Sequence, residues 1–444
     1  MSSTTISKST PTVVLPAAGQ NRRMFPLNTL EHKSLLTVGG QPLLIAALRD
    51  LADHGFQRAV VIQSQPVGSA RLEQVVADHR LPIEVEFVQQ AEPRGMGDAI
   101  LRAGDQLEGP FCVVAPYQVR AGRILQRLRE TGSDAAVCSA PTDHPEWHGM
   151  LSIDGDRAIG LVEKPAPQDA PSNQKIQAAY CLPAEFLDLL RQEIPAEYNF
   201  ETALNTLMGQ RQVALVRSDQ ALPSLKYPWQ LFEFQSDYWH DRATTISDQA
   251  EVAQSVVVDD TLGPVVIEAG ASVGHAARLV GPCYLGRDAY VGDYCLIRGS
   301  SIEAKAVVGA FSELARSIVM PGASLHQSYV ADSIVGESAA LGAGLITANR
   351  RLDRRPITVT VAEKKVATGL ARLGSVIGHQ ANVGVRTTTM PGVMIGAQAV
   401  VYPGVTLYDH VPAGGTAREP VNKEPVNKKP STNKGALNQE LHEH

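Results

Sequence analysis

A repeat of six residues constrains the second half of this chain more than any other sequence feature. Neither an α-helix nor an isolated strand has a period of six. A triangular coil does, because each side of the triangle holds one short strand and three sides complete a turn. The repeated apolar positions are Ile267, Val273, Leu279, Leu285, Val291 and Ile297, then Val335, Leu341 and Thr347, and finally Ile377, Val383, Thr389, Ile395, Val401 and Leu407.

These repeats predict a left-handed parallel β-helix of hexapeptide repeats over residues 246–415. In such a prism the aliphatic residue points inward, and the small residue that often follows it permits the corner. Stacked coils satisfy most backbone groups, although the two ends of the stack expose edges that need covering. The flat outer faces of a prism usually pack together, which favours a homotrimer.

The repeat is interrupted by residues 348–374, which carry too much charge to fill a prism. We expect this segment to project from the coil as a loop, and loops on rigid scaffolds often carry function. After residue 415 the sequence EPVNK occurs twice in a stretch rich in Pro, Lys and Asn. This tail (416–444) and the polar lead (1–10) have little to bury and are predicted to be disordered.

Residues 11–245 have a different pattern, in which short apolar runs alternate with amphipathic stretches. Strands are expected at 12–19, 58–63, 84–89 and 109–116, and a helix at 41–56. Strands separated by helices imply βαβ units and a mostly parallel, Rossmann-like sheet. The expected fold class is therefore α/β, with a ligand site beyond the carboxyl ends of the strands and the β-helix as a second domain.

Composition excludes several classes of partner. A formal net charge of −6 gives no electrostatic basis for binding nucleic acid. No stretch reaches membrane-spanning length, and the N-terminus lacks an apolar signal core. The five cysteines form no CxxC pair, so they are interpreted as reduced thiols and not as a disulfide frame or zinc site. A cytoplasmic protein with small-molecule ligands, no nucleic acid and no membrane partner is expected.

The segment LPAAGQNRRMFPLNTLEHKSLL (15–36) resembles the signature loop of the sugar-1-phosphate nucleotidylyltransferases. In that family a Gly-rich turn, an Arg and a downstream Lys hold the phosphates of a nucleotide, and Gly19, Arg23 and Lys33 match these positions. Asn21 stands where the family usually has Gly. Because Asn tolerates a positive φ, the turn is expected to survive.

Four further segments resemble the same family in the same order. QAEPRGMGDAI is similar to the segment that contacts base and ribose, with Gln90 and Gly95 matching, while EWHGML and GLVEKP are similar to the sugar-binding segments, with Gly149, Glu163 and Lys164 matching. KYPWQLFE resembles the stretch that closes the domain. The resemblance implies that this domain binds a nucleoside triphosphate or a nucleotide-sugar.

Two departures concern the magnesium ion that this family uses. The family places an Asp after the central strand and an Asp or Asn late in the domain, whereas this chain has Tyr117 and Gln230 there. A phenol and an amide cannot replace two carboxylates around a hard dication. Asp98 and Glu92 lie nearby in sequence, but nothing in their spacing indicates a metal site. Magnesium binding is therefore doubtful, and nucleotidyl transfer is expected to be weak or lost.

LHQSYVADSIVGESAALGAGLITANRR (325–351) resembles the acetyltransferase half of the bifunctional enzymes that acetylate and uridylylate glucosamine-1-phosphate. The archaeal-type enzymes are the most similar. The resemblance implies that His326 is the general base and that Tyr329 and Asn349 contact the sugar. A neutral imidazole near pH 7 can take the proton of an amine that attacks a thioester. Arg298 matches the position that holds the sugar phosphate.

Other positions of this second site depart from the family. Ala315 replaces a phosphate-binding Lys, Ala340 replaces an Asn, and Arg355 replaces a Lys while keeping its charge. Arg355 and its Arg-rich neighbours could bind the phosphates of coenzyme A or a phosphorylated acceptor, or could be a solvated charge cluster. The base is kept while the acceptor pocket is altered, which suggests an acyltransferase with a changed acceptor.

The favoured interpretation is a transferase that moves an acyl group from acetyl-CoA or another acyl-CoA to an amino-sugar phosphate or a related amine. The N-terminal domain would bind a nucleotide or nucleotide-sugar. Two alternatives remain open: an active sugar-1-phosphate nucleotidylyltransferase with an unrecognised metal ligand, and a non-catalytic regulatory or scaffold protein.

Overall fold

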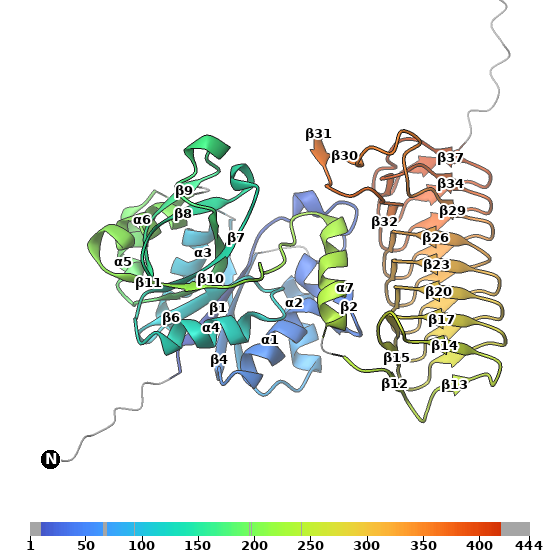
Figure 1. Cartoon of the computed structure of the whole chain (residues 1–444), viewed down its shortest axis with the longest axis horizontal. Coiled ribbons are helices and arrows are strands. Elements are labelled where there is room, and N and C mark those ends of the chain that lie inside the picture. The colour runs from blue at the N-terminus through green and yellow to red at the C-terminus, as the bar shows by residue number, and fades with distance from the viewer. Residues whose placement is uncertain are drawn as a thin grey trace, which may run out of the picture.

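The computed structural model describes residues 10–64, 69–92, 94–194, 196, 198–240 and 242–418. An N-terminal α/β domain lies beside a β-helix, as Figure 1 shows. The expected lead falls almost entirely, and the expected tail largely, outside the described residues. Thr416–Ala417 form strand β38, which pairs with β36 (Val400–Val401), so the β-helix extends two residues beyond its predicted boundary at 415.

The N-terminal domain is built on one nine-stranded sheet, which confirms the predicted α/β class. Strands β1, β4, β5 and β6 pair in parallel, and β10 runs antiparallel between β6 and β7. In sheet order the strands are β5 (Glu84–Gln90), β4 (Arg58–Ser64), β1 (Thr12–Ala17), β6 (Phe111–Val114), β10 (Gln174–Leu182), β7 (Ala136–Pro141), β11 (Val213–Arg217), β9 (Arg157–Glu163) and β8 (Gly149–Asp154).

Helices pack on this sheet through apolar faces. The predicted helix at 41–56 is α1 (Leu43–Asp53), and six of its apolar residues are buried. A two-residue hairpin of β2 (Thr37–Val38) and β3 (Gln41–Pro42) precedes it. The other helices are α2 (Ser69–Asp78), α3 (Met96–Arg102), α4 (Ala121–Glu130), α5 (Phe186–Gln192), α6 (Asn199–Gln210) and α7 (Leu231–Trp239).

The hexad positions form the interior of a three-sided prism. All fifteen predicted inward residues are at most 6% exposed, and most belong to one continuous apolar cluster. The small residues that follow them are needed for close stacking, since a Cβ on Gly292 would lie 2.5 Å from the backbone nitrogen of Ala310 in the next coil. The β-helix begins at β12 (Thr245–Ile246), close to the predicted boundary.

Three parallel sheets make the sides of the prism. The first consists of β12, β15 (Val265–Ile267), β18 (Cys283–Leu285), β21 (Ser301–Ile302), β24 (Ile318–Val319), β27 (Ile334–Val335), β32 (Val376–Ile377) and β35 (Met394–Ile395). The second consists of β13 (Glu251–Val252), β16 (Ser272–Val273), β19 (Tyr290–Val291), β22 (Val307–Val308), β25 (Ser324–Leu325), β28 (Ala340–Leu341), β33 (Asn382–Val383), β36 and β38. The third consists of β14 (Val257–Asp259), β17 (Arg278–Val280), β20 (Leu296–Arg298), β23 (Glu313–Ala315), β26 (Tyr329–Ala331), β29 (Ile346–Thr347), β34 (Thr388–Thr389) and β37 (Thr406–Leu407).

The first sheet of the prism is the one that contacts the N-terminal domain. Its outward residues Ile318, Ile334, Val376 and Met394 stand in register on successive strands and are buried. They pack in one apolar cluster with Met24, Leu27, Leu36, Trp229 and Phe234 of the N-terminal domain. Helix α7 lies between the two domains in Figure 1. Apolar burial of this extent holds the domains against each other.

A buried carboxylate adds a polar contact to this interface. Glu303 accepts hydrogen bonds from the backbone N–H groups of Gly39 at 2.8 Å and Gly40 at 2.7 Å, which form the β2–β3 turn. Both glycines have a positive φ, and a Cβ on Gly40 would lie 2.0 Å from the Tyr284 hydroxyl. The turn therefore requires glycine for conformation and for space.

Residues 348–374 leave the prism as predicted, but they do not project freely. Strands β30 (Thr358–Val361) and β31 (Lys364–Ala367) form a hairpin that reaches toward the N-terminal domain (Figure 1). Ile357, Val359 and Val361 are at most 4% exposed and join the interdomain cluster. The apolar residues of this segment therefore cover the domain interface. The prediction of a projecting loop rested on the charged residues of the segment and did not take these apolar residues into account.

Candidate functional sites

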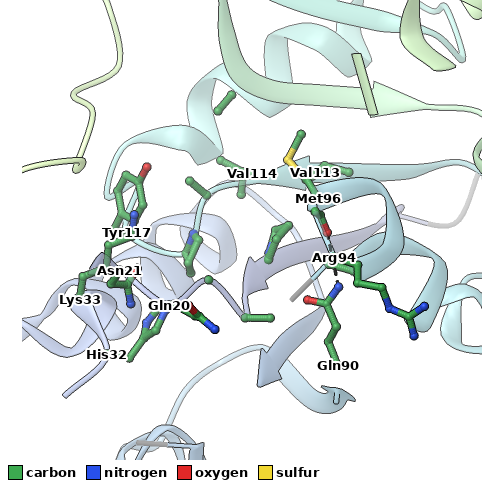
Figure 2. A pocket seen from close by; sticks show the side chains of 18 of the residues that line it. Gln20, Asn21, His32, Lys33, Gln90, Arg94, Met96, Val113, Val114 and Tyr117 are labelled. Atoms are coloured by element: carbon green, nitrogen blue, oxygen red, sulfur yellow. Dashed lines mark hydrogen bonds between the residues drawn. The ribbon is translucent and has the colours of Figure 1, made fainter. Parts of the chain in front are cut away.

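A cavity of about 830 Å³ opens beyond the carboxyl ends of β1 and β6, where the topology predicted a ligand site. Figure 2 shows Lys33, Asn21 and Tyr117 at one end and Gln90 and Arg94 at the other. Of the residues predicted to bind the nucleotide, the cavity wall contains Gly19, Lys33, Gln90 and Gly95. Arg23 is exposed and is not among its lining residues.

The turn after β1 keeps the conformation that the family's glycine would supply. Asn21 has φ 51° and ψ 26°, in the left-handed region, and the 3₁₀ helix of residues Arg22–Met24 begins directly after it. Its carbonyl accepts a hydrogen bond from the Met24 N–H at 2.8 Å. The predicted survival of this turn is confirmed.

The Lys33 ammonium group lies at one end of the cavity and is held from two sides. It donates a hydrogen bond to the Leu225 carbonyl at 2.9 Å and lies 4.6 Å from the centroid of the Tyr117 ring. Burial lowers the pKa of Lys33 to about 8, and the positive charges of Arg23 and Lys226 contribute to this shift. A bound anion would relieve that repulsion.

The opposite end of the cavity is fixed by a buried amide. The Gln90 amide nitrogen donates to the Asp98 carboxylate at 2.6 Å and to the Gly95 carbonyl at 3.4 Å. Gly95 has φ 106°, and a Cβ there would lie 2.4 Å from the Ala196 carbonyl oxygen. Asp98 also contacts Arg102 at 3.4 Å. This carboxylate is therefore engaged in positioning Gln90.

The residues at the two magnesium-ligand positions do not fit a divalent cation. Burial raises the pKa of Tyr117, so its phenol stays protonated. The Gln230 side-chain oxygen accepts hydrogen bonds from the backbone N–H groups of Lys226 at 2.7 Å and Tyr227 at 3.0 Å, which caps the helical turn Pro228–Gln230. Among the residues that the structure describes, those that line the cavity include no Asp or Glu. Among the described residues, no cluster of three or more His, Cys, Asp and Glu could hold a metal.

The predicted sugar-binding residues meet on strands β8 and β9. Gly149 pairs directly with Glu163, and a Cβ on Gly149 would lie 2.8 Å from the Glu163 carboxylate. Lys164 has φ 48°, and its ammonium group lies 3.0 Å from the Tyr198 hydroxyl and 3.4 Å from Glu163. The glycine thus leaves room for the acidic side chain beside it.

Further cations surround this predicted sugar-binding region. The pKa of Lys226 is lowered by burial and by the charges of Arg23, Lys164 and Lys175. His148 lies near the same charges. Its pKa is lowered to about 4, mainly by burial and to a smaller extent by the positive charges of Lys175 and Lys226. The region is therefore suited to an anionic ligand.

On the β-helix, the predicted acceptor residues share the third sheet of the prism. Leu314 and Val330 point inward, so their neighbours Glu313 and Tyr329 point outward on paired strands. Arg298 lies on the next strand, and its guanidinium group bonds to the Glu313 carboxylate. The structure thus brings Arg298 and Tyr329 to one face, with an acidic partner that the sequence prediction missed.

His326 occupies a corner between the second and third sheets, directly before that face. It stands where neighbouring coils have Gly309 and Gly342, and its side chain is exposed. The inward residues around this corner, Leu325 and Val330, are five positions apart, whereas the equivalent pair in the preceding coil is six apart. The shorter corner places Tyr329 three residues after the imidazole.

Asn349 belongs to a network that the sequence prediction did not include. Its amide nitrogen donates to Asp332 at 2.6 Å, and Arg316 binds the same carboxylate through two nitrogens at 2.6 and 2.7 Å. Arg316 directly follows Ala315, which is buried at the position of the family's phosphate-binding Lys. The sequence therefore does supply a cation here, because Arg316 stands one residue after the position where the family's Lys is missing. Arg355 is exposed on segment 348–374.

Comparison with known proteins identifies the N-terminal domain. The family model described as nucleotidyl transferase matches residues 12–250, more than half of the chain. This chain belongs to the nucleotidyl transferase family. A similar solved structure is the UDP-glucose pyrophosphorylase from Acinetobacter baumannii, which is 20% identical, with a TM-score of 0.46, and the match covers 52% of this chain and 95% of that one.

Other relatives match along most of this chain, across both domains. The bifunctional protein GlmU of Methanococcus vannielii is 26% identical over 398 residues, which covers 87% of this chain and 92% of the relative. A bifunctional sugar-1-phosphate nucleotidylyltransferase/acetyltransferase of Sulfurisphaera tokodaii is 27% identical and covers 90% of this chain and 97% of the relative. The archaeal bifunctional resemblance seen in the sequence is thereby confirmed. None of the described helices is long and apolar enough to cross a membrane.

Proposed function

We propose that this protein is a transferase whose β-helix catalyses N-acyl transfer from an acyl-CoA to an amino-sugar phosphate or a related amine. His326 is the general base, and Tyr329 and Asn349 position the acceptor. The amine nitrogen forms a bond to the thioester carbonyl carbon, and His326 takes the amine proton. The C–S bond then breaks, and the coenzyme A sulfur leaves as a thiolate that takes up this proton. The observation that carries the proposal is the exposed imidazole at a shortened corner, beside the face that holds Arg298 and Tyr329.

The acceptor in this proposal carries a phosphate. Arg298 and Arg316 both lie on or beside the outward face of the third sheet, and each is about half exposed despite its carboxylate partner. Guanidinium groups suit the planar, multidentate recognition of phosphate. Arg316 would supply the charge that Ala315 lacks, and Arg355 would contact the phosphates of the acyl-CoA.

The N-terminal domain has a different role in this proposal. Its cavity, together with the neighbouring strands β8 and β9, binds a nucleoside triphosphate or a nucleotide-sugar. Gly19 and Lys33 contact the phosphates, and Arg23 acts on them from outside the cavity wall. Gln90 and Gly95 contact the nucleoside, and Gly149, Glu163 and Lys164 contact the sugar. Nucleotidyl transfer is weak or absent, because no carboxylate among the described lining residues seats magnesium beside the reacting phosphates. Cations of the chain neutralise the ligand instead.

An assay of coenzyme A release tests the acyl-transfer proposal. Acetyl-CoA is incubated with a panel of amines that includes glucosamine-1-phosphate, and free thiol is measured. His326→Ala should lower turnover by roughly two to four orders of magnitude. His275→Ala is a matched control, because His275 is also an exposed histidine at a corner of the β-helix. Equal turnover in the wild-type and His326→Ala proteins would remove the assignment.

Two other outcomes would favour the alternatives. Robust magnesium-dependent release of pyrophosphate with a sugar-1-phosphate would identify an active nucleotidylyltransferase. No thiol release across the panel, together with tight binding of a nucleotide-sugar, would identify a regulatory or scaffold protein.

A homotrimer is part of the proposal. Two sides of the prism are not covered by the N-terminal domain, and large apolar side chains are exposed there. Tyr294 and Phe311 stack with ring centroids 5.1 Å apart while remaining 59% and 64% exposed. Exposed aromatic clusters are typical of interfaces. Light scattering coupled to size exclusion should give three times the chain mass of 47.6 kDa.

A further inference from the structure

A histidine of the β-helix directly holds the phosphate-binding loop of the other domain. The His379 side chain is 2% exposed, and its Nε2 lies 3.2 Å from the carbonyl oxygen of Leu27. Leu27 is fully buried and lies between Gly19 and Lys33, in the loop that walls the nucleotide cavity. The contact spans 352 positions of sequence and joins the two domains.

Both ring nitrogens of His379 are used, which fixes the form of the imidazole. Nδ1 accepts a hydrogen bond from the Glu337 backbone N–H at 3.0 Å, so Nε2 carries the proton and donates to Leu27. Burial lowers the pKa of His379, which favours the same neutral form. The ring is therefore a rigid bridge from the backbone of one coil to the backbone of the loop.

Other contacts hold the same loop against the same coils. Met24 and Leu27 pack in the interdomain apolar cluster with Val376 and Met394. Glu31, further along the loop, is 5% exposed and pairs with Arg71, which also contacts Glu337 of the β-helix at 3.3 Å. The titratable groups at this junction are thus Glu31, Arg71, Glu337 and His379.

We propose that His379 is a positioning residue for the nucleotide site: the β-helix, through this side chain, sets the conformation of loop 19–33. The effect on nucleotide affinity rests on the proposed nucleotide site, whereas the contacts between His379 and the loop do not depend on it. A loop that must present backbone N–H groups and Lys33 to phosphates loses affinity when it loosens, because ordering it then draws on the binding energy. The N-terminal domain is accordingly incomplete without the coils that carry Glu337 and His379.

Two substitutions separate the bonds of His379. In His379→Asn, a short amide can still accept from the Glu337 N–H but does not reach Leu27. In His379→Gln, the longer amide places a donor near the position of Nε2. His410 offers a matched control, because its Nδ1 accepts from the Met394 N–H at 3.0 Å and its Nε2 lies 3.0 Å from the Thr360 carbonyl in hairpin β30–β31. His410→Asn therefore removes an exposed bond of similar length away from the loop.

The experiment measures backbone amide exchange in the unliganded full-length proteins and then UTP binding by calorimetry. His379→Asn should speed exchange in residues 20–32 by roughly tenfold, the effect of one lost buried hydrogen bond, and weaken UTP binding by a similar factor. His379→Gln should restore most of both, and His410→Asn should change neither.

Exchange in residues 20–32 that is the same in all four proteins would overturn the inference, whatever their thermal stabilities. Loosening of the loop by His410→Asn as large as that by His379→Asn would also overturn it, because a general loss of stability would then explain both. Wild-type protein that binds none of a panel of nucleoside triphosphates and nucleotide-sugars, UTP included, would refute the proposed nucleotide site, while the exchange data would still decide the role of His379.

Discussion

The Lys33 ammonium group lies 4.6 Å from the centroid of the Tyr117 ring. In the family pattern that this sequence resembles, a magnesium-binding Asp stands at the position of Tyr117. A cation over an aromatic face is attracted by the ring, and the Leu225 carbonyl at 2.9 Å completes its hydrogen bonding. Where the family pattern has an Asp that binds a dication, this chain has the neutral Tyr117 ring, which contacts the Lys33 ammonium group. We therefore expect the site to bind phosphates but to stabilise a pentavalent phosphorus poorly.

The charge of Lys33 gives nucleotide binding a definite pH dependence. Its pKa in the unliganded protein is about 8, lowered from 10.5 by burial and neighbouring cations. Above that pH the amine becomes neutral and attracts phosphate less, so affinity should fall as pH rises. We expect UTP to bind roughly tenfold more weakly at about pH 9 than at about pH 7. Lys33→Arg should flatten the profile, since arginine stays charged, and a flat wild-type profile would contradict the assignment.

Gln230 should contribute to stability and not to metal binding. Its side-chain oxygen caps the turn that leads into α7 by accepting from the N–H groups of Lys226 and Tyr227. Gln230→Ala should lower the free energy of unfolding by about 1 kcal/mol, as for other lost caps. Gln230→Glu keeps an acceptor of the same length and should stay close to wild type. Urea unfolding with and without magnesium measures both, and a stabilisation of the wild type by magnesium would count against this role.

Sequence reasoning recovered the fold because its signals are local. Inward hexad residues such as Leu285 and Ile377 are buried as predicted, and Asn21 adopts the positive φ expected of it. Contacts between distant segments had no such signal. Nothing near His379 in the sequence indicates Leu27, and the aliphatic residues of segment 348–374 were hidden among charges. The loss of the family's metal ligands at Tyr117 and Gln230 could be predicted from the family pattern, but the capping role of Gln230 is visible only in the folded chain.

Asp332 should control the orientation of Asn349 in acyl transfer. It holds the Asn349 amide at 2.6 Å and the Arg316 guanidinium group through two bonds. Asp332→Ala frees both side chains, so kcat/KM should fall roughly ten- to a hundredfold through loss of positioning. The pair Arg351–Asp353 has the same two-bond geometry at 2.8 and 2.6 Å but is exposed on segment 348–374. Asp353→Ala is therefore the matched control, and an equal loss in both variants would contradict the role of Asp332.

Glu31 should make the stability of the whole chain fall as pH rises. Burial, with the nearby Glu337 charge, raises the pKa of Glu31 from 4.5 to about 8, although Arg71 opposes the shift. Between these values the folded protein binds a proton that the unfolded chain has lost, so unfolding becomes easier as pH increases. Thermal melting from about pH 5 to about pH 8 should show this decline, and Glu31→Gln should remove most of it because the amide does not titrate. The substitution retains a side chain of nearly the same shape, so a decline that persists unchanged in Glu31→Gln would show that the proton binds elsewhere.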